Sequence, residues 1–108
     1  MAGSATAQEC GWVDAFVAGT VPSDAVTCDA SVCQWRFEYR ALEAHTLFEK
    51  IRAALEVCVG PEATQDAPVN HLDSYDLRVF SAKDGAVYLS IKDKAALDAT
   101  FVFLRRGP

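Results

Sequence analysis

All four cysteines of this chain, Cys10, Cys28, Cys33 and Cys58, lie within its first 58 residues, out of 108 in total. Four cysteines in so short a chain are typical of exported domains, because disulfides form and persist in oxidising compartments. Each disulfide would contribute about 2–4 kcal/mol, a large fraction of the stability of a small domain. We therefore expect two disulfides, which restrict how the first half of the chain can fold.

Four cysteines can pair in three ways, and a length argument favours Cys33–Cys58 with Cys10–Cys28. If the chain turns near Ala41, Cys33 lies about 26 Å back along a strand, and Cys58 lies about 26 Å forward along a helix. A helix that returns over the strand would bring these two residues level. The alternative is a local Cys28–Cys33 ring, with Cys10–Cys58 joining two helices.

The cysteines have two other possible uses. A four-cysteine zinc site is one, although only the Cys28-x4-Cys33 spacing falls in the range of zinc knuckles. Buried free thiols in an intracellular protein are the other. The sequence contains no Cys-x-x-Cys redox motif.

The start of the chain agrees with export. Ala5-Thr6-Ala7 before Gln8 resembles the end of a cleaved signal peptide, although so common a pattern also arises by chance in a leader. We predict that residues 1–7 are a disordered leader or signal-peptide remnant and that residues 8–108 form a single domain. The expected location is periplasmic or secreted.

Composition places the chain among globular proteins and makes two kinds of partner poor candidates. Hydrophobic residues make up 51% of the chain, and the formal net charge is -5. A net acidic chain is poorly suited to bind nucleic acid or an anionic membrane over its whole surface. The apolar runs are too short to span a bilayer, so we expect no membrane span.

Residue periodicity predicts six elements. The longest is a helix from Ala41 to Cys58, which the Gly60-Pro61 pair ends. A hairpin is predicted at Asp84-Gly85, a common two-residue turn signal. The other segments are a short helix over 7–18, a loop over 20–33, a strand from Trp35 to Arg40, a polar connection over 61–73, and strands over 74–82, 86–92 and 99–106.

This order of elements, α-β-α-β-β-β, predicts an α+β fold. We expect a four-stranded, largely antiparallel sheet with the long helix packed on one face and two disulfides stapling the domain.

Catalytic chemistry has little support in the sequence. The chain has two histidines, and no metal-binding histidine motif, phosphate loop or nucleophile elbow is present. His45 fits a surface position on the long helix. His71, Asp73 and Ser74 stand together on the polar connection, where they fit an ordinary turn as well as an active-site loop. We expect no cofactor and no bound metal.

One face of the sheet is the candidate binding site. If Trp35, Phe37 and Tyr39 face the long helix and the other strands turn their most aliphatic side inward, the opposite face mixes aromatic with basic residues. Aromatic residues and arginine on a rigid sheet are typical of protein-binding hot spots. The predicted binding residues are Arg36, Arg40, Arg78, Tyr88, Phe101 and Phe103. The same alternation adds Glu38, Phe80, Ser90, Lys92 and Arg105 to this face.

Two alternatives would remove this site. The first helix, with Trp12, Val13, Phe16 and Val17, could cover the face and make its aromatic residues part of the core, or a dimer could form through it.

The sequence thus favours a small exported, non-catalytic protein that binds another protein or an anionic ligand. An enzyme of hydrolase or lyase type that uses His71, Asp73 and Ser74 is one alternative, and a structural subunit of an oligomer is the other.

Overall fold

The computed structural model of the chain describes residues 10, 11, 13, 16, 27, 28, 31–63, 75–82 and 85–107. The described positions of the predicted first helix, namely 10, 11, 13 and 16, are helical. The predicted leader over residues 1–7 and residues 64–73 of the polar connection lie outside the described residues. The elements named below follow in chain order: β1 (Thr27–Cys28), β2 (Val32–Glu38), α2 (Leu42–Cys58), β3 (Tyr75–Ala82), β4 (Gly85–Lys94), a 3-10 helix η1 (Ala95–Leu97) and β5 (Ala99–Gly107).

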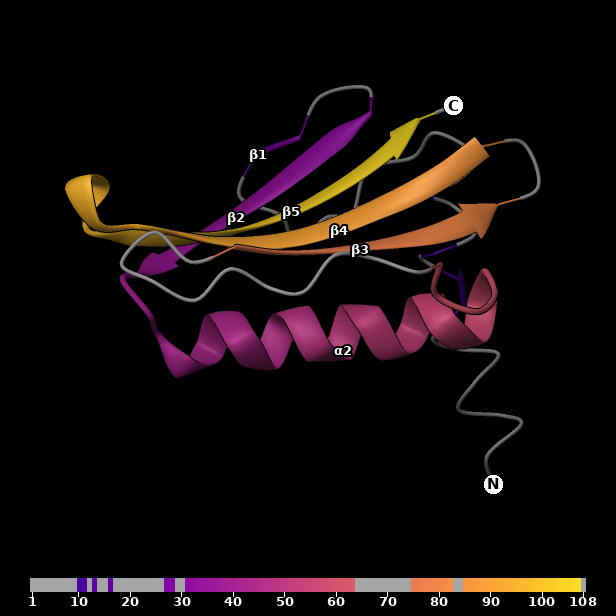
Figure 1. Ribbon diagram of the computed structural model, residues 1–108, viewed down its shortest axis with the longest axis horizontal. Helices are drawn as coiled ribbons and strands as arrows, with labels where there is room; N and C mark the ends of the chain where they lie inside the picture. The colour runs from indigo at the N-terminus through magenta and orange to yellow at the C-terminus, as the bar shows by residue number, and fades with distance from the viewer. Residues whose placement is uncertain are drawn as a thin grey trace.

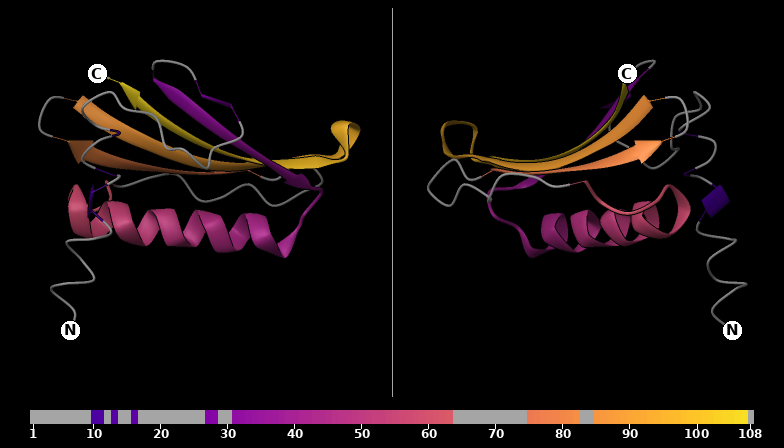
Figure 2. Two further views of the ribbon diagram at one scale, coloured as in Figure 1. Left: turned by 180° about the vertical axis from the view of Figure 1, so that it is seen from behind. Right: turned by 45° about the vertical axis from the view of Figure 1, so that its right-hand side comes forward.

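Four of the strands, in the order β2-β5-β4-β3, form an antiparallel sheet, and α2 runs along one face of it (Figure 1). Figure 2 shows the same two layers from behind and obliquely. The predicted α+β fold is therefore confirmed. The sequence did not predict β1, because this two-residue strand lies inside the segment predicted as a loop. β1 pairs with the outer edge of β2 and adds a fifth strand to the sheet.

The apolar residues of α2 recur every three or four positions, so one stripe of the helix faces the sheet. The buried residues of this stripe are Ala44, Phe48, Ile51, Ala54 and Leu55. The helix ends as predicted, since Val59 and Gly60 both donate backbone N–H bonds to the carbonyl of Leu55. Gly60 has a φ of +147°, which glycine adopts without strain, and Pro61 follows it.

The core lies between α2 and the sheet. Cys33 and Trp35 of β2 are buried in it, and Phe37 packs at its border, so the predicted inward orientation is confirmed for Trp35 and Phe37. Tyr39, predicted to share this face, lies in the turn after β2. The central strands add alternate aliphatic residues, as two-residue periodicity requires. The sheet residues of the buried core are Cys33, Trp35, Phe80, Val87, Leu89, Ile91, Val102 and Leu104.

The two disulfides connect Cys10 with Cys58 and Cys28 with Cys33. The favoured pairing, Cys33–Cys58 with Cys10–Cys28, is wrong, and the alternative pairing is the one observed. No cysteine in the chain is free, so the zinc-site and free-thiol interpretations are wrong as well.

The lateral position of α2 explains the pairing. The helix packs mainly over β4 and β5 and much less over β2. β4 lies two strands from β2, so the part of α2 that packs over β4 is displaced sideways from β2 by about 10 Å. Cys58 on α2 and Cys33 on β2 would therefore be far apart even if they were level along the lengths of their elements. Cys33 instead lies directly opposite Cys28 in the β1–β2 pair, with 4.1 Å between their Cα atoms.

Candidate binding face

The face of the sheet that points away from α2 follows from the strand register, because directly paired residues of antiparallel strands share a face. We call it the open face, since α2 covers the other side and no described element lies over this one (Figure 1). The central residues of the open face are Gln34 and Arg36 of β2, Phe101, Phe103 and Arg105 of β5, Tyr88, Ser90 and Lys92 of β4, and Tyr75, Leu77 and Val79 of β3.

The register arranges these residues in rows across the strands. One row runs Tyr75, Lys92, Phe101, Arg36, so that aromatic rings and cations alternate across four strands. The next row places Phe103 beside Phe101 on β5, and the two rings stack with centroids 5.8 Å apart. The open face therefore has an aromatic centre on β5 with cations on either side.

Each of three cations lies over an aromatic ring. The guanidinium of Arg36 lies 5.6 Å from the ring centroid of Phe101. The ammonium of Lys92 lies 5.1 Å from Tyr75 and 5.2 Å from Phe103. Arg105 stacks on Tyr88 at 4.0 Å. Such contacts contribute about 0.5–1 kcal/mol at exposed sites, which favours these side-chain positions without fixing them.

These three cations differ from other basic residues in their electrostatic partners. Arg40, Arg52 and Arg78 each form an ion pair with a carboxylate. Within the described part of the chain, no such ion pair involves Arg36, Lys92 or Arg105. Among the residues that the structure describes, no carboxylate therefore pairs directly with these three cations.

The described residues of the first helix do not cover this face. Cys10 is bonded to Cys58 at the end of α2, and Val13 and Phe16 are fully or almost fully buried in the core on the α2 side. Phe101 is 9% exposed but lies outside that core cluster. For Val13 and Phe16, the alternative that this helix lies across the open face is wrong; Trp12 and Val17 lie outside the described residues.

Arg78 and Phe80 do not lie on the open face, contrary to the predicted placement. Phe80 pairs with Val87 and is fully buried in the core, and Arg78 pairs with Leu89 on the same α2 side. Leu77 and Val79, which were expected to face inward, lie on the open face. A shift of one residue in strand parity moves every side chain to the other face, and the buried ring of Phe80 determines which face is inside.

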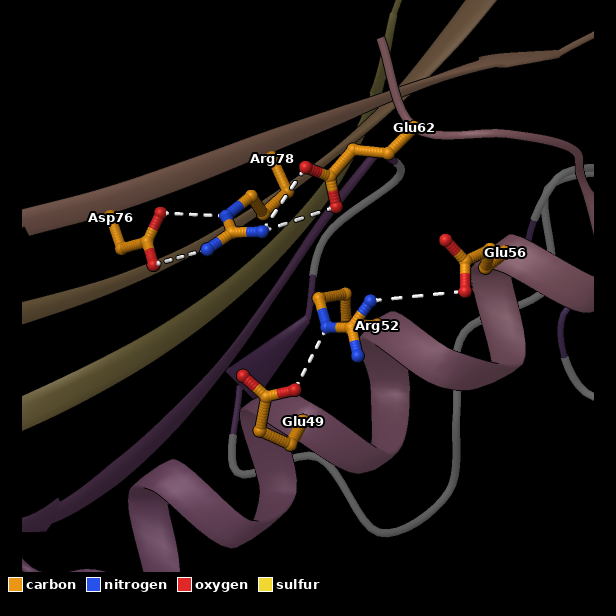
Figure 3. A network of polar contacts seen from close by, with 6 residues as sticks. All are labelled: Glu49, Arg52, Glu56, Glu62, Asp76 and Arg78. Carbon is orange, nitrogen blue, oxygen red and sulfur yellow. Dashed lines mark hydrogen bonds and ion pairs between the residues drawn. The ribbon is translucent and has the colours of Figure 1, made fainter. Parts of the chain in front are cut away.

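Arg78 is tied to the edge of the sheet by two carboxylates (Figure 3). Its Nε and one terminal nitrogen donate to the carboxylate of Asp76 at 2.8 and 3.0 Å, and its other nitrogen pairs with Glu62 at 3.1 Å. The hydrogen bonds with Asp76 raise the pKa of Arg78 above its ordinary value, against the opposing effect of burial. These contacts give Arg78 an evident structural role, in which it joins β3 to the segment after α2.

Arg40 lies at the turn after β2 and belongs to a second polar cluster. Its Nε lies 3.3 Å from the buried carboxylate of Asp93. Its backbone N–H donates to the hydroxyl of Thr100, which in turn donates to Asp93. Asp93 and Thr100 are paired residues on the α2 side of the sheet, so Arg40 is held at the end of the sheet, away from the aromatic centre.

Of the predicted binding residues, the structure thus brings together Arg36, Tyr88, Phe101 and Phe103. Lys92 and Arg105, which alternation also placed on this face, lie there as well, and the structure adds Tyr75. Their cross-strand partners identify them: Lys92 is opposite Phe101, and Arg105 is opposite Tyr88.

The structure does not describe the residues of the alternative enzymatic site. His71, Asp73 and Ser74 lie outside the described residues, and His45 is exposed on α2. Among the described residues, no three His, Cys, Asp or Glu side chains are grouped as a metal site would require. Of the described helices, none is long and apolar enough to cross a membrane.

Comparison with known proteins adds no assignment. No family model matches the chain, and no match was found among curated proteins or solved structures.

Proposed function

We propose that this protein is a small exported, non-catalytic binding protein that recognises another protein through its open face. Two intramolecular disulfides support a periplasmic or secreted location, because such bonds persist in oxidising compartments. The function itself must be argued from the site rather than from the fold.

The observation that supports binding most strongly is the array of rings and cations on the open face. Aromatic and arginine side chains are enriched at binding hot spots, since aromatic rings bury large areas with few rotatable bonds and the arginine guanidinium forms several polar contacts. Here the strands fix the backbone of every member, and the cation–ring contacts restrict the long side chains. The backbone of this surface is therefore ordered before binding, which lowers the entropic cost of association.

Site-specific photo-crosslinking tests the proposal. A benzophenone side chain at position 34, on β2 directly opposite Phe103 of the open face, is compared with one at position 46, which is exposed on α2. Each purified protein is incubated with the extracellular or periplasmic fraction of the native host and irradiated. We expect protein adducts from position 34 that are absent from position 46 and are lost when Phe103→Ala is added.

The adducted partner is then identified by mass spectrometry, purified and titrated against both proteins. Equal adducts from both positions would contradict the proposal, as would a complete lack of adducts from position 34. Retention of the thermal melting temperature in Phe103→Ala within a few degrees confirms that lost binding does not reflect lost folding.

A further inference from the structure

The open face carries a charge opposite to that of the whole chain. Including the strand ends, its described positions hold four basic residues and one acidic residue: Arg36, Lys92, Lys94 and Arg105, and Glu38. The complete chain nevertheless has a formal net charge of -5. Positive charge is therefore concentrated on one face of an otherwise acidic protein.

The spacing of the cations indicates the size of the anionic group that they could bind. Arg36 and Lys92 lie in one row, two strands apart, which corresponds to about 10 Å. Arg105 lies four residues beyond Phe101 along β5, which corresponds to about 13 Å. These distances separate the Cα atoms, so the three cations are spread over several strands and residues of the face, and a chain with several separated anionic groups can contact all of them at once.

Apolar surface lies between and beside these cations. The partly exposed Phe103 lies at the centre beside Phe101, which is only 9% exposed, and Leu77 and Val79 extend the apolar area toward the β3 edge. This combination fits a peptide with both carboxylate and apolar side chains. We propose that the docking segment of the partner is such an acidic, partly apolar peptide; this inference rests on the proposed function of the open face.

Two other occupants fit the face less well. A second copy in a symmetric dimer would place Arg36, Lys92 and Arg105 against the same patch of its twin, where like charges repel. Single-stranded nucleic acid needs accessible ring planes for base stacking. On this face Arg36 already lies over Phe101, and Lys92 lies over Phe103.

Fluorescence anisotropy with three synthetic probes tests the inference. The probes are labelled 12-residue peptides in which leucine alternates with glutamate, glutamine or lysine. We expect the Glu-Leu peptide to bind at least tenfold more tightly than the Gln-Leu peptide, with no measurable binding of the Lys-Leu peptide. Its affinity should fall as salt is raised from 50 to 500 mM, because exposed charge pairs are screened.

A matched pair of variants tests whether the cations of the open face, rather than the net charge of the protein, bind the peptide. Arg36→Gln/Lys92→Gln removes two cations from the open face, and Lys50→Gln/Arg52→Gln removes two from α2, so both variants have the same net charge. The first should weaken binding of the Glu-Leu peptide at least tenfold, and the second by less than threefold. Equal losses in the two variants would show general attraction only and overturn the inference.

The remaining outcomes separate this inference from the proposed function. Equal binding of the Glu-Leu and Gln-Leu peptides, abolished by Phe103→Ala, would overturn the acidic partner while supporting a binding role for the face. Tighter binding of a labelled 12-mer of deoxythymidine than of the Glu-Leu peptide would replace the peptide with a nucleic acid. Failure of the Glu-Leu peptide to bind at 1 mM would also overturn the inference, whereas the crosslinking experiment tests the proposed function independently.

Discussion

Thr100 is a fully buried polar residue whose hydroxyl joins two parts of the chain that are far apart in sequence. It accepts a hydrogen bond of 2.7 Å from the backbone N–H of Arg40 and donates one of 2.6 Å to the carboxylate of Asp93. Buried polar groups are costly unless they are hydrogen-bonded, so the two contacts account for a threonine in this position. The bond also holds Arg40, whose φ of 57° is uncommon for a residue with a side chain.

Replacement of Thr100 by valine, which has nearly the same shape, should destabilise the protein by about 1–3 kcal/mol. The hydroxyl is lost while its buried partners remain. Thermal unfolding followed by circular dichroism should show a melting temperature several degrees below that of the wild type. Thr46→Val, on the exposed side of α2, is the control and should change little. A Thr100→Val melting temperature equal to that of the control would contradict this role.

Arg40 illustrates what sequence cannot supply at this scale. Alternation along the strand predicted it on the open face, together with Arg36. β2 ends at Glu38, and Arg40 lies in the turn that follows, where strand alternation no longer applies. Its position also depends on contacts with Thr100 and Asp93, about 60 and 53 residues away in sequence. Contacts of this kind appear only once the strands are paired.

At the scale of elements, either side of β3 could be expected to face the core, and only the pairing of β3 with β4 shows which side does. Leu77 and Val79 are more aliphatic than Asp76 and Arg78, so composition favoured the wrong side. A two-residue hairpin loop, however, pairs even positions of β3 with odd positions of β4. In the structure Ala82 pairs with Gly85 and Phe80 with Val87, so the hairpin lies one residue earlier than the predicted Asp84-Gly85 turn but keeps the same parity. Once Val87 is assigned to the core, the predicted turn requires Phe80 to be there too. The sequence therefore contained the information needed to orient β3, but in the length of the hairpin turn rather than in the composition of the strand.

A matched pair of truncations tests the assignment of faces. Phe80→Ala should cost about 3–5 kcal/mol, because it empties a fully buried site in the core. Phe103→Ala removes a ring that is partly exposed on the open face and should cost about 1 kcal/mol, the scale of its stacking on Phe101. Urea unfolding of both variants measures the difference. Costs of similar size, or the reverse order, would contradict the assignment of β3.

At the scale of the whole molecule, the two disulfides constrain the chain to different extents. Cys10–Cys58 spans 48 residues, and Cys28–Cys33 spans only five. Sequence predicted the presence of two bonds but not their pairing, because the length argument ignored where α2 lies across the sheet. The long-range bond ties the segment with Val13 and Phe16 to the end of α2, while the short one fastens β1 to β2.

Removal of the long-range bond should therefore be the more damaging change. Loop-closure entropy gives about 4 kcal/mol for Cys10–Cys58 and about 2 kcal/mol for Cys28–Cys33. The double variants Cys10→Ala/Cys58→Ala and Cys28→Ala/Cys33→Ala, compared by urea unfolding, should differ in that order. Peptide mapping without reduction should recover these two linkages and no others. Recovery of a Cys33–Cys58 peptide would overturn the observed pairing.

The short strand β1 covers part of one edge of the sheet, and a second segment covers part of the other. β1 occupies the outer edge of β2 at Cys33 and Gln34, and on the opposite side the backbone N–H of Ala63 bonds to the carbonyl of Val79. Uncovered strand edges invite pairing with other chains, and proteins protect them with short covering segments. Here one cover is fastened by a disulfide, and the other lies beside the ion pair between Glu62 and Arg78. The Cys28–Cys33 bond, while oxidised, thus also holds the segment that covers the edge of β2, and its reduction would expose that edge to pairing with other chains.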